Sequence, residues 1–259
     1  MNRKKYESKN VVSSYIKMTL QNPEVMILVK HRERIVGKHI LDIGCGSGRT
    51  TAILKNLSSG YIGIDYSVTM IESCRERFKD VSFARGDVRD MSEFRDDEFD
   101  FIMFSFNGLD SINHEDRLKG LREIHRVLKQ DGLFVFSSHN RNHRHAISRP
   151  KMKFSATPCK QAGNFIKFFK STRNRLRNKN HQVFNEQYAI INDVAHNYAM
   201  LTYYIDKEHQ VSQLVDTGFK TIEMYDTSGN MLNIDSNDED SAWIYYVAKK
   251  IIQKQDKQT

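Results

Sequence analysis

The sequence has few cysteines and no long hydrophobic run. Cys45, Cys74 and Cys159 are far apart and form no Cys-x-x-Cys pair, which argues against a disulfide framework and against a zinc site. No run of about 18 apolar residues is present, so we expect no membrane span. The N-terminal segment is basic but lacks a following apolar stretch, which argues against a signal peptide. These absences predict a cytoplasmic protein that holds no metal.

Acidic residues are absent from one long segment, residues 141–180. This segment contains twelve Lys and Arg residues. Because the whole chain has a formal net charge of +8, the remaining residues carry a net charge of −4. The basic character therefore belongs to one segment, which indicates a local surface or a local partner rather than a property of the whole fold.

The sequence does contain enough apolar residues for a core. Of its 259 residues, 39% are hydrophobic, 10% are aromatic and 28% are charged. This composition is typical of globular proteins and excludes a wholly disordered or fibrous chain. The length fits one domain with a sizeable insertion better than two ordinary domains.

Short apolar runs alternate with segments of helical periodicity through the first part of the chain. The apolar runs are rich in Phe, Val and Ile, as in strands buried on both faces. Ser67 precedes one of the helical segments and is a suitable N-cap. Strict alternation predicts a parallel, doubly wound sheet. The expected strands are 39–43, 61–65, 81–83, 99–106 and 133–138, and the expected helices are 49–57, 67–78 and 117–128.

The alternation breaks after Ser138 and resumes near residue 206. The resumed pattern predicts a helix over 207–217, which Gly218 ends, and strands over 219–225 and 242–248. Only a polar loop separates these two strands, so they should pair antiparallel as a hairpin. Residues 6–36 are expected to form two short helices, the second starting after Pro23.

We therefore expect an α/β fold with a doubly wound, seven-stranded, mostly parallel sheet and a C-terminal antiparallel hairpin. A lid insertion should follow the fifth strand. The expected parts are an N-terminal helical cover over 1–36, a core over 37–139 and 206–259, and a basic insertion over 140–205.

A glycine-rich turn directly follows the first expected strand, in the run LDIGCGSGRT at 41–50. Glycines let the backbone turn tightly and let a ligand approach without a Cβ in the way. Open α/β sheets bind ligands at the carboxyl ends of their strands. Arg49 stands where a dinucleotide-binding fingerprint needs a third small residue. The turn therefore predicts a nucleotide-like cofactor and disfavours NAD and FAD.

This turn resembles motif I of the class I S-adenosylmethionine-dependent methyltransferases, and further stretches resemble the same family in order. Asp65 ends the second expected strand, where the family has an acid that binds the ribose hydroxyls. GDV at 86–88 is similar to the family's adenine-binding stretch, FDFIMF at 99–104 to its fourth strand, and RVLKQDG at 126–132 to its RVLKPGG turn. The resemblance covers 39–139 closely and 207–250 loosely.

The resemblance implies S-adenosyl-L-methionine as the cofactor and S-adenosyl-L-homocysteine as its product. In the N-terminal cover, a tyrosine is expected to close over the cofactor. The residues implied in cofactor binding are Asp42, Gly44, Gly46, Gly48, Asp65, Tyr66, Asp87, Val88 and Phe104, together with Tyr15.

Methyl transfer from a sulfonium chiefly requires alignment of acceptor, methyl and sulfur, and a hydroxyl acceptor also benefits from a base. His139 follows the fifth expected strand, at the rim where the methyl should lie. If residues 189–197 are helical, Asp193 and His196 share one face and would pair as a base and its orienting carboxylate. We predict catalytic roles for His139, His196 and Asp193, and acceptor binding by Asn107, Asn140, Tyr198 and Tyr203.

The predicted acceptor is a small or sugar-like molecule, including an anionic one, methylated at oxygen or nitrogen by direct displacement. The fourth strand is not followed by the Asn/Asp-Pro-Pro-Tyr/Phe sequence of exocyclic-amine methyltransferases of DNA and glutamine. A cofactor-binding protein without turnover is an alternative, because a fold does not dictate a function. The sequence leaves the oligomeric state open.

The basic insertion has several interpretations, because residues 161–177 interleave aromatic and aliphatic side chains with cations. A lid helix would pack these apolar side chains on the core and present cations to an anionic acceptor. A membrane-surface helix would give access to a lipid-linked acceptor. A nucleic-acid patch would neutralise RNA phosphates. A solvated basic face without a partner is the remaining alternative.

Overall fold

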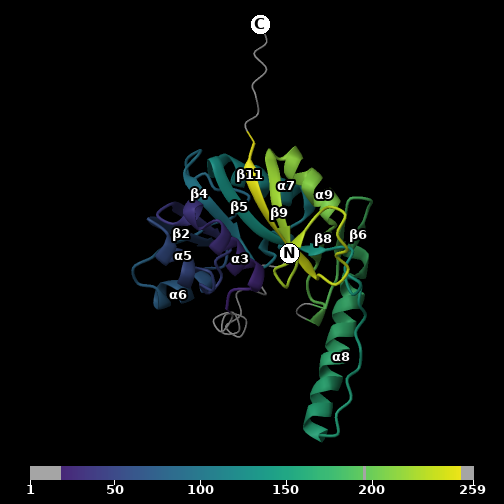
Figure 1. The fold of residues 1–259 in the computed structure, drawn as a ribbon. Coiled ribbons are helices and arrows are strands. Elements are labelled where there is room, and N and C mark those ends of the chain that lie inside the picture. The colour runs from purple at the N-terminus through teal and green to yellow at the C-terminus, as the bar shows by residue number, and fades with distance from the viewer. Residues whose placement is uncertain (1–18, 195–196, 252–259) are drawn as a thin grey trace.

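The computed structural model describes residues 19–194 and 197–251 and contains one large mixed sheet (Figure 1). The strand order is β10-β9-β11-β5-β4-β1-β2-β3, and β1 to β5 run parallel. These five strands are β1 His39–Ile43, β2 Gly60–Asp65, β3 Ser82–Arg85, β4 Phe99–Phe104 and β5 Leu128–Asn140.

The C-terminal strands complete the sheet in the opposite direction. β11 lies between β5 and β9 and is antiparallel to both, and the short β10 is antiparallel to β9 at the edge. The prediction of an α/β sheet with an antiparallel C-terminal hairpin and an insertion after β5 is therefore confirmed, but the described sheet has eleven strands rather than seven, because a short edge strand and three strands of the insertion also pair into it. The strands are β9 Phe219–Tyr225, β10 Met231–Leu232 and β11 Trp243–Lys250.

Helices cover both faces of the sheet, because neighbouring strand residues point to opposite sides. In β1, Ile40 packs in one apolar cluster with residues of α3, α4 and α5, whereas Leu41 and Ile43 pack in another with residues of α7 and α9. The helices are α3 Asn22–Lys30, α4 Arg32–Ile35, α5 Thr51–Leu57, α6 Val68–Arg77, α7 His114–Val127 and α9 Lys207–Asp216.

Helix starts follow the capping side chains. Ser67 caps α6 as predicted, by accepting a hydrogen bond from the Met70 amide. The predicted start of α7 at residue 117 is wrong, because Asn113 caps the helix earlier. The predicted start after Pro23 is also wrong: α3 begins at Asn22, because proline is tolerated in a first turn, where the amide has no intrahelical partner. Residues 6–18 lie outside the described residues.

The insertion contributes three strands to the sheet and a long helix outside it. β8 pairs parallel with the end of β5, β7 pairs antiparallel with β8, and β6 with β7. The helix expected over 189–197 is not formed in its described part, because residues 188–191 are a strand, and His196 lies outside the described residues. The elements are α8 Pro158–Asn178, the 3-10 helix η2 Lys179–His181, β6 Val183–Phe184, β7 Tyr188–Ile191 and β8 Thr202–Ile205.

α8 projects away from the body of the protein rather than lying across the sheet (Figure 1). Phe165, Ile166, Phe169 and Leu176 are all exposed. The expectation that a lid helix packs these side chains on the core is therefore wrong. The reason is local: α8 turns polar side chains, among them Gln161 and Asn178, toward the neighbouring chain.

Candidate functional site

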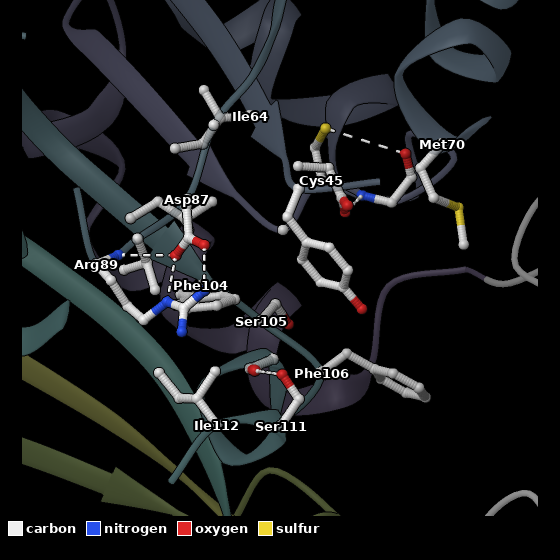
Figure 2. Close-up of a pocket in the computed structure, with 18 of the residues that line it drawn as sticks. Cys45, Ile64, Met70, Asp87, Arg89, Phe104, Ser105, Phe106, Ser111 and Ile112 are labelled. Carbon is white, nitrogen blue, oxygen red and sulfur yellow. Dashed lines mark hydrogen bonds and ion pairs between the residues drawn. The ribbon is translucent and has the colours of Figure 1, made fainter. Parts of the chain in front are cut away.

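A cavity of about 810 Å³ lies at the carboxyl ends of β1, β2 and β4. Its size is in the range of small-molecule and cofactor sites. Eight of the ten predicted cofactor residues line it, and two of these, Asp87 and Phe104, are labelled in Figure 2. They are Asp42, Gly44, Gly46, Asp65, Tyr66, Asp87, Val88 and Phe104.

The glycine-rich turn forms one wall of the cavity. Gly44 has a φ of 62°, and a Cβ there would come within 2.7 Å of the Phe104 ring. Gly46 has a φ of 57°, and its Cβ would meet only the Gly44 carbonyl oxygen, at 3.9 Å. The backbone at Gly46 is therefore open to a ligand, as a cofactor cradle requires. Gly48 lies outside the cavity lining, next to the Phe78 ring.

Asp65 connects the glycine-rich turn to the start of α6. Its Oδ2 accepts a hydrogen bond from the Gly46 amide at 3.1 Å, and its Oδ1 accepts one from the Ser67 amide at 2.8 Å. Burial raises the pKa of Asp65 to about 6. Each carboxylate oxygen has a second lone pair, so ribose hydroxyls can still bind to it.

The buried Asp42 carboxylate bonds to side chains from neighbouring parts of the cavity wall. Its Oδ2 accepts hydrogen bonds from Thr50 Oγ1 at 2.6 Å and from the Tyr61 hydroxyl at 2.7 Å. Burial raises the pKa of Asp42 to about 6. These contacts fix β1, β2 and the residue before α5 relative to one another.

Arg89 holds the carboxylate of Asp87 at the next part of the wall (Figure 2). Arg89 Nε lies 2.9 Å from Asp87 Oδ1, and Nη2 lies 2.6 Å from Oδ2. Arg89 also pairs with Asp116 at 2.8 Å. The hydrogen bonds from Arg89 lower the pKa of Asp87, which keeps this carboxylate ionised. Sequence reasoning missed Arg89, although it follows Asp87 by only two residues.

The N-terminal cover is fastened to the site by a buried ion pair. Arg49 lies 2.5 and 2.7 Å from the two carboxylate oxygens of Glu24 in α3. Burial alone would raise the pKa of Glu24, but the Arg49 guanidinium holds it below its ordinary value. Ser105 and Tyr245 also donate hydrogen bonds to Glu24. Arg49, which stands where a dinucleotide-binding fingerprint needs a small residue, therefore joins the N-terminal cover to the glycine-rich turn.

The loop after β4 has an unusual backbone. Phe106 and Asn107 are consecutive non-glycine residues with φ values of 56° and 58°. Such left-handed residues cost free energy and persist where the surroundings hold them, commonly at functional sites. Here the Asn107 amide donates to Ser137 Oγ at 2.8 Å, and Arg49 lies 5.3 Å from the centre of the Phe106 ring. Phe106 lines the cavity, and the 3-10 helix η1 Gly108–Ser111 follows.

His139 lies beside this loop and pairs with a buried acid. Its Nδ1 lies 2.7 Å from Asp110 Oδ2, and its backbone amide donates to the same oxygen. Its Nε2 lies 3.4 Å from Asn107 Nδ2. If Nδ1 carries the proton that Asp110 accepts, the unprotonated Nε2 accepts a hydrogen bond from Asn107 Nδ2 and can act as a base when an acceptor hydroxyl replaces Asn107. His139 and Asn107 do not themselves line the cavity, but Phe106 and Gly108, on either side of Asn107, do.

Asp110 belongs to a buried polar network that sequence reasoning missed. The fully buried Arg117 lies 2.5 Å from Asp110 Oδ1 and also donates to Ser138 and Gln210. Its guanidinium carbon lies 4.5 Å from the centre of the Tyr203 ring. These residues come from η1, α7, β5, α9 and β8, so no local spacing in the sequence could reveal the network.

The predicted acceptor residues Asn140, Tyr198 and Tyr203 and the predicted catalytic residue Asp193 are buried and are hydrogen-bonded within the protein. Asn140 donates to the carbonyl oxygens of Asp238 and Ser241, and the Tyr203 hydroxyl lies 2.8 Å from His114 Nδ1. The Tyr198 hydroxyl lies 3.1 Å from Ser148 Oγ, and Asp193 accepts from Tyr204 at 3.0 Å. These four predicted residues are absent from the described cavity lining. His196 and Tyr15 lie outside the described residues.

The insertion contributes different side chains to the cavity. They are His181, Val183, Ile190 and Leu201, from η2, β6, β7 and the residue before β8. The cavity is thus bounded by the glycine-rich turn on one side and by the insertion together with the β4–η1 loop on another. Nothing in the sequence pattern singled out these four residues, because they become neighbours only through the pairing of β6, β7 and β8.

Comparison with known proteins adds a family match and fold relatives. Residues 40–132 match the family described as "Methyltransferase domain". An uncharacterized methyltransferase, YcgJ of Bacillus subtilis, is 30% identical over 129 residues, which are 48% of this chain and 49% of that protein. A demethylmenaquinone methyltransferase of Clavibacter sepedonicus is 36% identical over 104 residues, 39% of this chain and 41% of that protein. The chain thus spans about half the length, or less, of the curated relatives it matches.

The fold extends further than the sequence similarity. The crystal structure of an S-adenosylmethionine-dependent methyltransferase from Clostridium acetobutylicum aligns with a TM-score of 0.63. The alignment covers 91% of this chain and 94% of that one at 14% identity. The two proteins therefore share a fold over almost their whole lengths.

Proposed function

We propose that this chain is a class I S-adenosylmethionine-dependent methyltransferase that methylates an oxygen or nitrogen of a small-molecule or sugar-like acceptor. The observation that carries the proposal is the cavity itself. Its wall combines the glycine-rich turn, Asp65 and Asp87 with the β4–η1 loop and the insertion. The name of the demethylmenaquinone methyltransferases supports a small-molecule acceptor.

The cofactor end of the cavity fits S-adenosylmethionine, which supplies an electrophilic methyl group on a sulfonium when bound. Asp65 would accept hydrogen bonds from the ribose hydroxyls, and Asp87 would accept from the adenine amino group. Gly46 leaves the backbone open beside the ligand. The strained Phe106–Asn107 backbone is held rigidly by Ser137, which supports a positioning role for this loop.

His139 is the proposed base for a hydroxyl acceptor. Asp110 holds the His139 ring by its Nδ1, so that Nε2 would take the acceptor proton as the oxygen attacks the methyl group. The acceptor oxygen would gain the methyl group that S-adenosylmethionine supplies, the carbon–sulfur bond electrons would stay with sulfur, and S-adenosyl-L-homocysteine would be the second product. Asp110 would stabilise the imidazolium that His139 forms on taking the proton. The segment 140–205 would supply the acceptor side of the cavity through His181, Val183, Ile190 and Leu201.

Transfer of labelled methyl into fractionated bacterial extract tests the proposal. Aqueous metabolites, lipid, RNA and protein would be counted separately, with Asp65→Ala as the blank. We expect label in the aqueous metabolites. His139→Asn should lower the rate of methyl transfer about 10²- to 10⁴-fold and leave the cofactor affinity unchanged. His145→Asn, an exposed histidine nearby, is the matched control. Tight cofactor binding without label in any fraction would instead indicate a cofactor-binding protein without turnover.

A further inference from the structure

α8 shows its apolar side chains to solvent, the reverse of an ordinary amphipathic helix. Ile166, Phe169 and Leu176 are 70%, 66% and 69% exposed, and Phe165 is also exposed. Their spacing of three, four or seven residues places them on one face of the helix. The helix has 21 residues and is therefore about 30 Å long, and it extends away from the body of the protein (Figure 1).

The opposite side of α8 is polar and makes the contacts with the rest of the chain. Gln161 accepts a hydrogen bond from the Ser155 amide at 2.7 Å. Asn174 donates to the Asn197 carbonyl at 2.8 Å, and Arg175 donates to the Ser148 carbonyl at 2.8 Å. These bonds fix the rotation of the helix about its axis. The outward direction of the apolar face is thus a consequence of specific contacts.

The charge around the exposed apolar face has one sign. Besides Arg175, which contacts Ser148 and Tyr198, α8 carries five cations, Lys160, Lys167, Lys170, Arg173 and Arg177, and residues 141–180 have no acid. Within the described residues, no ion pair joins any of these five to a carboxylate. An apolar face beside unpaired Lys and Arg is complementary to an anionic lipid surface, where apolar side chains enter the interface and cations meet head groups.

We propose that α8 docks the protein on the surface of an anionic lipid membrane, with Phe165, Ile166, Phe169 and Leu176 in the interface. Docking is at the surface, since no helix in ranges 19–194 and 197–251 is long and apolar enough to cross a membrane. Nucleic acid is a poorer occupant, because exposed Ile and Leu side chains add nothing to phosphate binding. This surface goes beyond the proposed methyl transfer and does not depend on it.

Docking would bring the cavity close to the membrane surface. α8 leads directly into η2, whose last residue, His181, lines the cavity, and Val183 follows in β6. The cavity wall therefore begins within one turn of the end of the docked helix. On the premise of the proposed function, an acceptor held at an anionic membrane surface would reach the site over a short path.

Co-sedimentation of the full chain with lipid vesicles tests the proposal. We expect binding to vesicles of phosphatidylcholine with phosphatidylglycerol, much weaker binding to phosphatidylcholine alone, and weakening with salt. Ile166→Glu with Phe169→Glu should lower the partition coefficient about 100-fold, since each buried side chain contributes about tenfold. Lys167→Gln with Lys170→Gln should lower it about fivefold per cation.

The matched control for the apolar variant is Val29→Glu with Val215→Glu. These valines are exposed on α3 and α9, away from α8, so the same charge change there should leave vesicle binding unaltered. Circular dichroism and cofactor affinity would establish that each variant is folded. Because the assay needs no methyl transfer, its result is independent of the proposed function.

Three outcomes would overturn the proposal. One is the absence of binding to anionic vesicles. Another is binding to an RNA homopolymer, with no vesicle binding, that the glutamate variant leaves unchanged, which would assign the segment to nucleic acid. The third is a dimer in sedimentation that the glutamate variant dissociates, with no vesicle binding, which would assign the apolar face to a second copy of the chain.

Discussion

The sheet core and the inserted segment use similar residues in opposite ways. In the core, apolar side chains at strand and helix spacing are buried, as Ile40 and Leu121 are, and the one fully buried arginine, among described residues, is paired. In α8, Ile166 and Phe169 have the same periodicity but face solvent, and the neighbouring cations have no carboxylate partner among the described residues. Periodicity therefore defines an apolar face, whereas the neighbouring chain decides whether that face is buried.

The largest expected difference between the regions concerns two arginines. Arg117→Met should lower the free energy of unfolding by about 3–5 kcal/mol, because it removes the buried guanidinium that offsets the charge of the buried Asp110. Arg173→Met in α8 should change it by less than about 0.5 kcal/mol, as expected of an exposed side chain. Urea unfolding of both variants measures the difference. Equal losses would mean that α8 is packed as tightly as the core.

Gly46 in the cavity wall and Gly163 in α8 allow the same substitution to be compared in the two regions. Gly46→Ala should raise the Kd for S-adenosylmethionine about 10- to 100-fold, because alanine is strained at a φ of 57° and its methyl group enters the cavity. Gly163→Ala in α8 meets no atom within 4 Å and should leave the Kd unchanged. It should also stabilise the helix by about 0.5–1 kcal/mol. Calorimetric titration of the two variants measures the Kd for S-adenosylmethionine of each. An unaltered Kd in Gly46→Ala would argue against a cofactor site in this cavity.

The smallest expected effect is the change with pH in the affinity of the cavity for S-adenosylmethionine. The Asp65 carboxylate is the form that accepts hydrogen bonds from ribose, and its pKa in the free protein is about 6. Affinity should therefore be constant above pH 6 and should fall by up to about tenfold per unit as the pH decreases below 6. Titrations between pH 5 and 8 measure this slope.

Asp65→Asn is the control for this titration. It removes the ionisation of Asp65 and leaves Asp42, whose pKa is also about 6, in place. If the affinity of Asp65→Asn still falls below pH 6, the pH dependence comes from Asp42 and not from Asp65.

Much of the cofactor half was predictable from local sequence. The strand ends and the turn after them are neighbours in the chain, so the spacing of the motifs was enough to assign Gly46, Asp65 and Asp87 to one cavity. Helix starts were less predictable, because Asn113 and Pro23 each moved a boundary by a few residues. The acceptor side was not predictable in the same way. Asp193 and Tyr198 are polar and close in sequence, yet they are buried in contacts of the insertion itself.

The seven predicted strands, the order of strands and helices along the chain, and the cavity wall made by the glycine-rich turn follow from periodicity and from residues a short distance apart. The tertiary fold set the partner of His139, since Asp110 is 29 positions away and reaches it through η1. It also decided that α8 turns its apolar face outward. Side-chain hydrogen bonds from Gln161, Asn174 and Arg175 fix that rotation, and an amphipathic pattern contains no information about which face meets the protein.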